Sequence, residues 1–198
     1  MTASASEPLP NRSSQATTSE ISRARRQRWA EVITAERART ESRRFIACHH
    51  GSPRRAVLDV QNPPHRAGRY HRIGGRPTWY GSSSEAGAWA EFIRSLPEGA
   101  DPAEFQRRIG RVDFDLVALD LASPELQRAL GVKPAELTAD DLTVCQTLAD
   151  LAAEAGFDGV LGPSAAAAGE TTVAVFGKSI GAKAAAVVDQ GVKTPTGL

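Results

Sequence analysis

The sequence has few cysteines and no long apolar run. Cys48 and Cys145 are the two cysteines among 198 residues, and they lie far apart along the chain. No run approaches the roughly 18 apolar residues of a membrane-spanning helix, and no secretory core follows Met1. Two isolated thiols are typical of core residues in a reducing compartment, not of a disulfide framework. We therefore expect a cytoplasmic protein with no membrane contact.

Several common site motifs are also absent. The four histidines show neither the Cys/His pairing nor the i, i+4 helical spacing of a metal site. Gly74 and Gly75 precede Arg-Pro and not a helix start, and no Walker lysine follows them. The run of Ser82, Ser83 and Ser84 lacks the flanking glycines of a nucleophile elbow. The sequence therefore predicts no metal site, no Rossmann or P-loop nucleotide site and no serine hydrolase.

The net charge of +1 hides an uneven distribution. Residues 1–44 contain nine of the 24 basic residues but five of the 23 acidic ones, so the remainder is mildly acidic. A protein that binds nucleic acid over its whole surface would be basic throughout. The body of the protein is therefore not expected to bind nucleic acid directly, whereas the arginine-rich start is suited to phosphates or another anionic surface.

The chain is long enough for a single domain with one core. Residues 1–20 are rich in Ser, Thr and Pro and nearly lack large apolar side chains, so we expect them to be disordered. The following residues favour a helix with a thin apolar stripe, either solvated or serving as a partner-binding arm. We divide the chain into a disordered to helical extension at 1–44, one domain at 45–180 and a C-terminal tail at 181–198.

Strands and helices are predicted to alternate irregularly in the body. In the clearest strand, apolar Val112, Phe114 and Leu116 alternate with aspartates, the period of a half-buried strand. Strands are expected at 56–60, 78–80, 111–121, 159–161 and 171–176. Helices are expected at 84–96, 124–130 and 138–155. This order favours an α/β protein of mixed α+β type, with helices flanking a mixed sheet, over a doubly wound fold.

The segment 54–76 concentrates positive charge. It contains two histidines and Asp59 as its one acidic residue. A guanidinium can hold two phosphate oxygens at once, so this density favours an anion site, although each arginine taken singly also fits a solvated surface position. The arginines are Arg54, Arg55, Arg66, Arg69, Arg72 and Arg76.

Three further polar side chains are candidates for a site. Neighbours on a strand face opposite ways, so an inward Trp79 leaves Tyr80 free to stack on a base and to donate a hydrogen bond. Glu91 points away from the centre of the apolar stripe of its helix, and the helical wheel alone favours a solvated position. Ser164 follows Pro163, where a serine usually forms a turn or a cap.

The order of these motifs resembles that of the RES domain family. Gly-Arg-Tyr at 68–70 is followed by Tyr80 and by Ala-x-x-Glu at 88–91. Asp-Gly-Val-Leu-x-Pro-Ser at 158–164 then precedes the strand at 171–176. RES domains are the toxin halves of bacterial RES–Xre toxin–antitoxin pairs, and characterised members consume NAD by hydrolysis, phosphorolysis or transfer of ADP-ribose. The resemblance implies a single RES domain with an ADP-ribosyltransferase-like mixed sheet.

The resemblance also implies roles for individual residues. Arg69, Tyr80, Glu91 and Ser164 match the family's catalytic arginine, tyrosine, glutamate and serine. We expect Arg69, Tyr80 and Arg72 to bind the dinucleotide. The carboxylate of Glu91 would stabilise the oxocarbenium-like ribose that forms as nicotinamide leaves.

The arginine motif departs from the family pattern. Gly-Gly-Arg-Trp/Phe-Asn in the family corresponds to Ala-Gly-Arg-Tyr-His at 67–71, and a second Gly-Gly-Arg occurs at 74–76. Arg76 is four residues from Tyr80, whereas Arg69 is eleven away, close to the family spacing. We interpret the second copy as a decoy.

The function implied is that of an NAD-degrading toxin that cleaves the nicotinamide–ribose N-glycosidic bond, with water or phosphate as acceptor. NAD is then a substrate, and no cofactor is expected. The expected partner is an Xre-type antitoxin that covers the active site and provides any contact with nucleic acid. Two alternatives stay open: a mono-ADP-ribosyltransferase acting on a protein, and a non-catalytic RES-like binding module.

Overall fold

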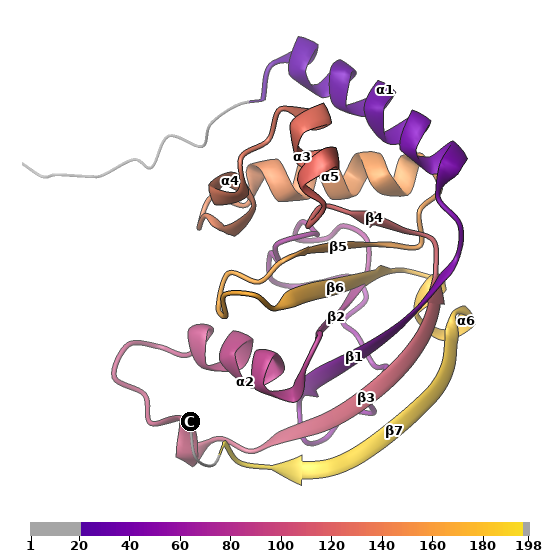
Figure 1. Ribbon diagram of the computed structural model, residues 1–198. Helices are drawn as coiled ribbons and strands as arrows, with labels where there is room; N and C mark the ends of the chain where they lie inside the picture. The colour runs from indigo at the N-terminus through magenta and orange to yellow at the C-terminus, as the bar shows by residue number, and fades with distance from the viewer. Residues whose placement is uncertain (1–20, 196–198) are drawn as a thin grey trace, which may run out of the picture.

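The protein is built on one curved, seven-stranded mixed sheet (Figure 1). The computed structural model describes residues 21–195. In chain order the elements are α1 (Arg23–Arg39), β1 (Arg43–Gly51), β2 (Thr78–Ser82), α2 (Glu85–Arg94), a 3-10 turn η1 (Pro102–Glu104), β3 (Arg107–Leu116), β4 (Ala118–Asp120), α3 (Pro124–Leu130), α4 (Pro134–Thr138), α5 (Thr143–Glu154), β5 (Gly159–Pro163), β6 (Thr171–Phe176), α6 (Ser179–Ala182) and β7 (Ala184–Lys193). The expected α+β architecture with a mixed sheet is confirmed.

The strand order in the sheet is β4-β5-β6-β2-β1-β3-β7. Strands β4 and β5 pair in parallel, and every other pair of neighbours is antiparallel. Figure 1 shows α1, α3, α4 and α5 gathered near β4 and β5, whereas α2 lies beside β1 and β2. Among residues 21–195, no helix is both long enough and apolar enough to cross a membrane.

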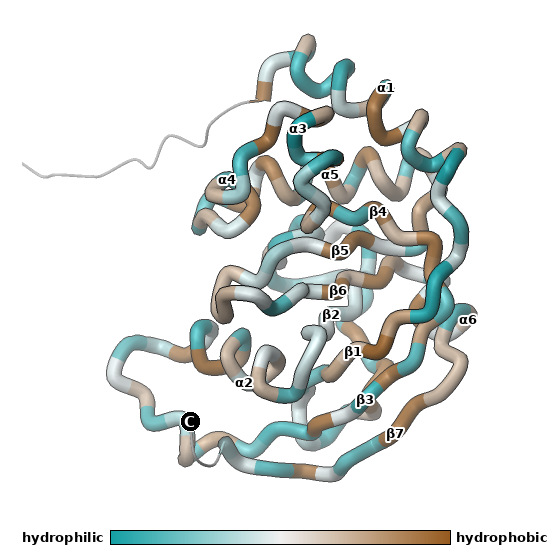
Figure 2. Tube along the Cα trace, in the orientation of Figure 1, coloured by the Kyte–Doolittle hydropathy of each residue, from teal (hydrophilic) through white to brown (hydrophobic). Residues whose placement is uncertain are grey.

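Helix α1 belongs to the body of the protein. Trp29 and Ile33 are completely buried against α3 and α5, and Trp29 Nε1 donates a hydrogen bond of 2.8 Å to the carbonyl of Leu130. Most other positions of α1 are hydrophilic in Figure 2, which is why the sequence suggested a separate extension at 1–44. That boundary is wrong for the helix, because two large side chains suffice to anchor it. The predicted disorder of 1–20 lies outside the described residues.

The prediction of a C-terminal tail at 181–198 is also wrong for the residues that the structure describes. Residues 184–193 form β7, which pairs along β3 and makes one edge of the sheet. Most side chains of β7 are exposed, Val187 and Val188 among them. A strand exposed on both faces has no alternation of buried and exposed positions, so its sequence carries no period of two.

Residues 56–60 do not form the predicted strand. They lie in the long connection between β1 and β2, where Val57 packs against Gly110 so closely that a Cβ on the glycine would lie 2.4 Å from the valine. The carbonyl of Val57 accepts a hydrogen bond of 2.8 Å from Trp79 Nε1. The apolar run therefore covers the sheet instead of joining it. The sequence did not reveal β1, which lies inside the sheet between β2 and β3.

The remaining elements agree with the sequence to within a few residues. Strands β2, β5 and β6 and helices α2 and α3 lie at the predicted positions. The strand expected at 111–121 is divided into β3, which already begins at Arg107, and β4. The helix expected at 138–155 is divided into α4 and α5. Asp141 lies between them and accepts a hydrogen bond of 2.9 Å from the backbone N–H of Thr143, two residues further on, which is the contact of an Asx-turn.

Candidate functional site

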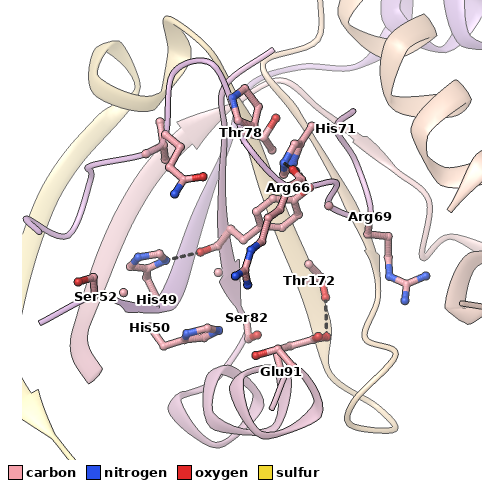
Figure 3. Close-up of a pocket in the computed structure, with 18 of the residues that line it drawn as sticks. His49, His50, Ser52, Arg66, Arg69, His71, Thr78, Ser82, Glu91 and Thr172 are labelled. Atoms are coloured by element: carbon pink, nitrogen blue, oxygen red, sulfur yellow. Dashed lines mark hydrogen bonds between the residues drawn. The ribbon is translucent and has the colours of Figure 1, made fainter. Parts of the chain in front are cut away.

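A cavity of about 740 Å³ opens between β1, β2, α2 and the long β1–β2 connection (Figure 3). This volume lies in the range of sites for small molecules and nucleotide cofactors. Four arginines and three histidines line it, with Asp59 and Glu91 as its carboxylates. The arginines are Arg55, Arg66, Arg69 and Arg107, and the histidines are His49, His50 and His71. The excess of positive charge suits an anionic ligand.

Glu91 projects from α2 into this cavity. The N-cap of the helix is Ser84, whose hydroxyl accepts a hydrogen bond from the backbone N–H of Gly87. Glu91 Oε1 accepts hydrogen bonds from Ser164 Oγ at 2.7 Å and Thr172 Oγ1 at 3.3 Å. Within the described chain, no hydrogen bond from protein reaches Oε2. One carboxylate oxygen is thus fixed, and the other remains available to a ligand.

Ser164 contacts Glu91 from outside the cavity. Its side chain is 7% exposed and does not line the cavity. Its hydroxyl donates to Glu91 and accepts from the backbone N–H groups of Ala166 and Ala167, each at 3.1 Å. The serine is therefore both the turn residue that its sequence context suggests and the group that orients the carboxylate.

Tyr80 borders the cavity, but its hydroxyl is already engaged. The Oη atom accepts a hydrogen bond of 2.9 Å from the backbone N–H of Tyr70. It lies 2.8 Å from His71 Nδ1, and His71 Nε2 lies 3.0 Å from the carbonyl of Arg66. A carbonyl only accepts, so Nε2 carries the proton and Tyr80 donates to Nδ1. Burial raises the pKa of Tyr80, so the hydroxyl stays protonated. The ring of Tyr80 is therefore the part that can contact a ligand.

The Gly-Arg motif is held against this network. Gly68 and His71 exchange backbone hydrogen bonds, and Gln146 of α5 donates to both of their carbonyls at 3.0 Å. A Cβ on Gly68 would lie 2.3 Å from His71 and 2.7 Å from Tyr80 Oη. Only glycine fits at this position, which explains why the motif begins with it.

The arginines of the motif region have different surroundings. Arg69 lines the cavity, and its Nη1 donates to the carbonyls of Leu137 and Ala139, each at 2.9 Å. Arg66 also lines the cavity, and its guanidinium has no hydrogen-bond or ion-pair partner among the described residues. Figure 3 shows it reaching into the middle of the space, whereas Arg69 lies toward one side. Nothing in the sequence distinguished Arg66 from the other arginines of 54–76.

Two other arginines of the segment 54–76, Arg72 and Arg76, do not line the cavity. Arg72 donates to Asp150, Gln146 and Thr147 of α5 and is not among the lining residues, so a direct contact with a ligand in the cavity is not supported. Arg76 also pairs with Asp150, and its guanidinium lies 4.4 Å from the ring centre of Phe176. Its interpretation as a decoy is consistent with this position, although it is a packed residue and not an exposed one.

Two histidines of β1, His49 and His50, form part of the cavity wall, a position that the sequence did not suggest. His49 Nδ1 lies 2.6 Å from the carbonyl of Tyr80 and therefore donates to it. Its ring stacks on Trp79 at 5.0 Å. Burial lowers the pKa of His49 to about 4 and that of His50 to about 3. Both rings are neutral near pH 7 and act there as hydrogen-bonding groups.

The described residues contain no group of three His, Cys, Asp or Glu side chains arranged to hold a metal ion. The arrangement offers instead one oriented carboxylate, an aromatic ring and several guanidinium groups around one cavity. Such a set can bind a phosphorylated ligand and stabilise positive charge that develops next to the carboxylate.

Comparison with known proteins agrees with this chemistry. The family model of the RES domain matches residues 34–195. A probable NAD(+) phosphorylase of Mycobacterium tuberculosis is 44% identical over 129 residues, which are 65% of this chain and 62% of that protein. The chain thus aligns with less than two thirds of that relative's length.

A chain in the crystal structure of the M. tuberculosis MbcT–MbcA toxin–antitoxin complex has a similar fold. The TM-score is 0.71 at 20% sequence identity, and the match covers 86% of this chain and 93% of that chain. At this level of identity the likeness concerns the fold.

Proposed function

Because the chain belongs to the RES domain family, we propose that it cleaves the nicotinamide–ribose bond of NAD and transfers the ADP-ribose to inorganic phosphate. The observation that carries the proposal is the carboxylate of Glu91, which two hydroxyls hold at the wall of a positively charged cavity. The name of the relative from M. tuberculosis favours phosphate over water as the acceptor. NAD is the substrate, and the proposed reaction uses no further cofactor.

In this reaction the C1–N bond of the nicotinamide ribose breaks, and its electron pair leaves with neutral nicotinamide. The ribose passes through an oxocarbenium-like state, whose positive charge Glu91 stabilises. A phosphate oxygen then bonds to C1, and the proton of that phosphate is released to water if it is not retained on the product. The products are nicotinamide and ADP-ribose 1″-phosphate.

The other cavity residues have roles that follow from their positions. The guanidinium groups of Arg66 and Arg69 bind the pyrophosphate, because both lie on the wall formed by the β1–β2 connection, to which Arg55 adds a third cation. The ring of Tyr80 offers a flat surface to the nicotinamide ribose end. Ser164 keeps Glu91 in place and does not touch the substrate. Arg72 supports the loop from outside, through α5.

We further propose that the protein is a cytoplasmic toxin held inactive by an antitoxin that covers the cavity. The fold shared with a chain of a toxin–antitoxin complex supports this proposal. Any contact with nucleic acid would come through an Xre-type antitoxin.

Inducing the chain alone in bacteria is expected to deplete NAD and to stop growth, because the dinucleotide is consumed faster than it is replaced. Cellular NAD is measured by mass spectrometry along with optical density. The Glu91→Gln variant, produced at the same level, should leave both unchanged. Growth arrest at an unchanged NAD level would contradict the proposed function.

A further inference from the structure

A second group of polar side chains lies on the α2 side of the cavity. The side chain of His50 lies near the start of β3. There Arg107 Nη2 donates a hydrogen bond of 3.3 Å to His50 Nδ1. Phe92 of α2 contacts both side chains, at 5.5 Å from the His50 ring centre and 4.9 Å from the Arg107 guanidinium carbon. His50, Arg107 and Glu91 all line the cavity. Figure 3 shows His50 and Glu91 on the same side of the cavity.

Arg107 is a cation without a counter-ion. No carboxylate of the described residues lies within ion-pair distance of it, and its buried Nε has no hydrogen-bond partner. Burial lowers the pKa of this guanidinium, which shows that its surroundings solvate the charge poorly. The next residue, Arg108, also has a buried Nε without a partner, but it has a counter-ion, because it is paired with Asp189, and it donates to the carbonyl of Pro53 at 3.0 Å. A positive group of this kind on a cavity wall is suited to an anionic ligand.

His50 adds a second donor to the same place. Its Nδ1 accepts from Arg107, so the proton of the neutral ring sits on Nε2. Because the pKa of His50 is lowered, the ring keeps this arrangement at neutral pH. A guanidinium and a neutral N–H beside each other can bind separate oxygens of one tetrahedral anion.

The proposed reaction has two anionic reactants, and the cavity has two sets of cations. Arg66 and Arg69 belong to the wall formed by the β1–β2 connection, whereas Arg107 belongs to the wall that carries Glu91. The attacking phosphate must approach the ribose carbon that Glu91 faces. We propose that Arg107 and His50 form a separate anion subsite for inorganic phosphate, the acceptor of ADP-ribose. This inference rests on the proposed function.

The inference is tested by steady-state kinetics in which NAD and phosphate are varied independently. Arg107→Gln is expected to raise the KM for phosphate on the order of 10-fold or more, because a charged hydrogen bond to the acceptor is lost. Its KM for NAD should change less than about 3-fold, since other arginines hold the dinucleotide. The matched control is Arg108→Gln, on the same strand, which should change neither KM. Arg107→Lys, which keeps the charge, should recover part of the phosphate affinity.

The outcomes separate this inference from the proposed function. A parent protein that leaves NAD intact would refute the function and the subsite together. A parent that consumes NAD at a rate independent of phosphate would refute the subsite and phosphate as the acceptor, and would leave NAD cleavage standing. An Arg107→Gln variant that raises the KM for NAD and not the KM for phosphate would refute the subsite alone. If Arg107→Gln does not fold, His50→Leu replaces it, and an unchanged KM for phosphate in that variant and in Arg107→Lys would equally overturn the inference.

Discussion

Replacing Glu91 by glutamine is expected to lower kcat for NAD cleavage by at least about 100-fold, the usual loss when a group that stabilises transition-state charge is removed. Glutamine retains an oxygen that can accept from Ser164 and Thr172, so the side chain keeps its position and loses only its charge. KM for NAD should change little, because the carboxylate acts on charge that appears only as the bond breaks.

The matched control for this variant is Glu98→Gln, which removes an exposed carboxylate just beyond α2. Turnover by Glu98→Gln should equal that of the parent. Circular dichroism melting of both variants checks that each is folded. If folded Glu91→Gln consumes NAD as fast as the parent, the role assigned to the carboxylate is wrong.

Replacing Arg69 by glutamine is expected to reduce kcat/KM for NAD roughly 30- to 1000-fold, or about 2–4 kcal/mol, because a charge-assisted contact with the pyrophosphate is lost. The guanidinium also donates to two carbonyls at the end of α4, so part of this loss comes from the position of the loop. Thermal melting of the variant therefore accompanies the kinetic measurement.

Arg76→Gln is the comparison that decides which arginine belongs to the motif. Its side chain is engaged by Asp150 and Phe176 outside the cavity, so its replacement should lower the melting temperature and leave kcat/KM within about 3-fold of the parent. A greater kinetic loss in folded Arg76→Gln than in folded Arg69→Gln would place the motif seven residues later than its family spacing indicates.

The sequence predicted much of the sheet, but it could not predict which distant residues meet in the site. Glu91 and Ser164 are 73 residues apart, and no spacing rule joins them. They meet because β2 pairs with β6, with Ser82 opposite Thr172, and because α2 follows β2 directly. The helical wheel placed Glu91 away from the apolar stripe, which is true of its own helix but says nothing about the sheet beside it. Only the order of motifs shared with the family indicated the pair.

The sequence analysis missed the residues that only their place in the fold brings to the cavity wall. Arg66 and Arg107 are single arginines in an arginine-rich chain, and their positions on the cavity wall come from the fold, which no sequence pattern records. His49 and His50 lie on β1, a strand that the sequence did not reveal. The edge strand β7 was missed for a related reason, because its exposed positions show no alternation.

The central claim is that this cavity cleaves NAD with phosphate as the acceptor, and analysis of the reaction products tests it most directly. The purified protein is incubated with NAD, with and without inorganic phosphate, and the products are identified by chromatography and mass spectrometry. The account predicts nicotinamide together with ADP-ribose 1″-phosphate, formed at a rate that rises with phosphate concentration. NAD left intact by the folded protein in the presence of phosphate would contradict it.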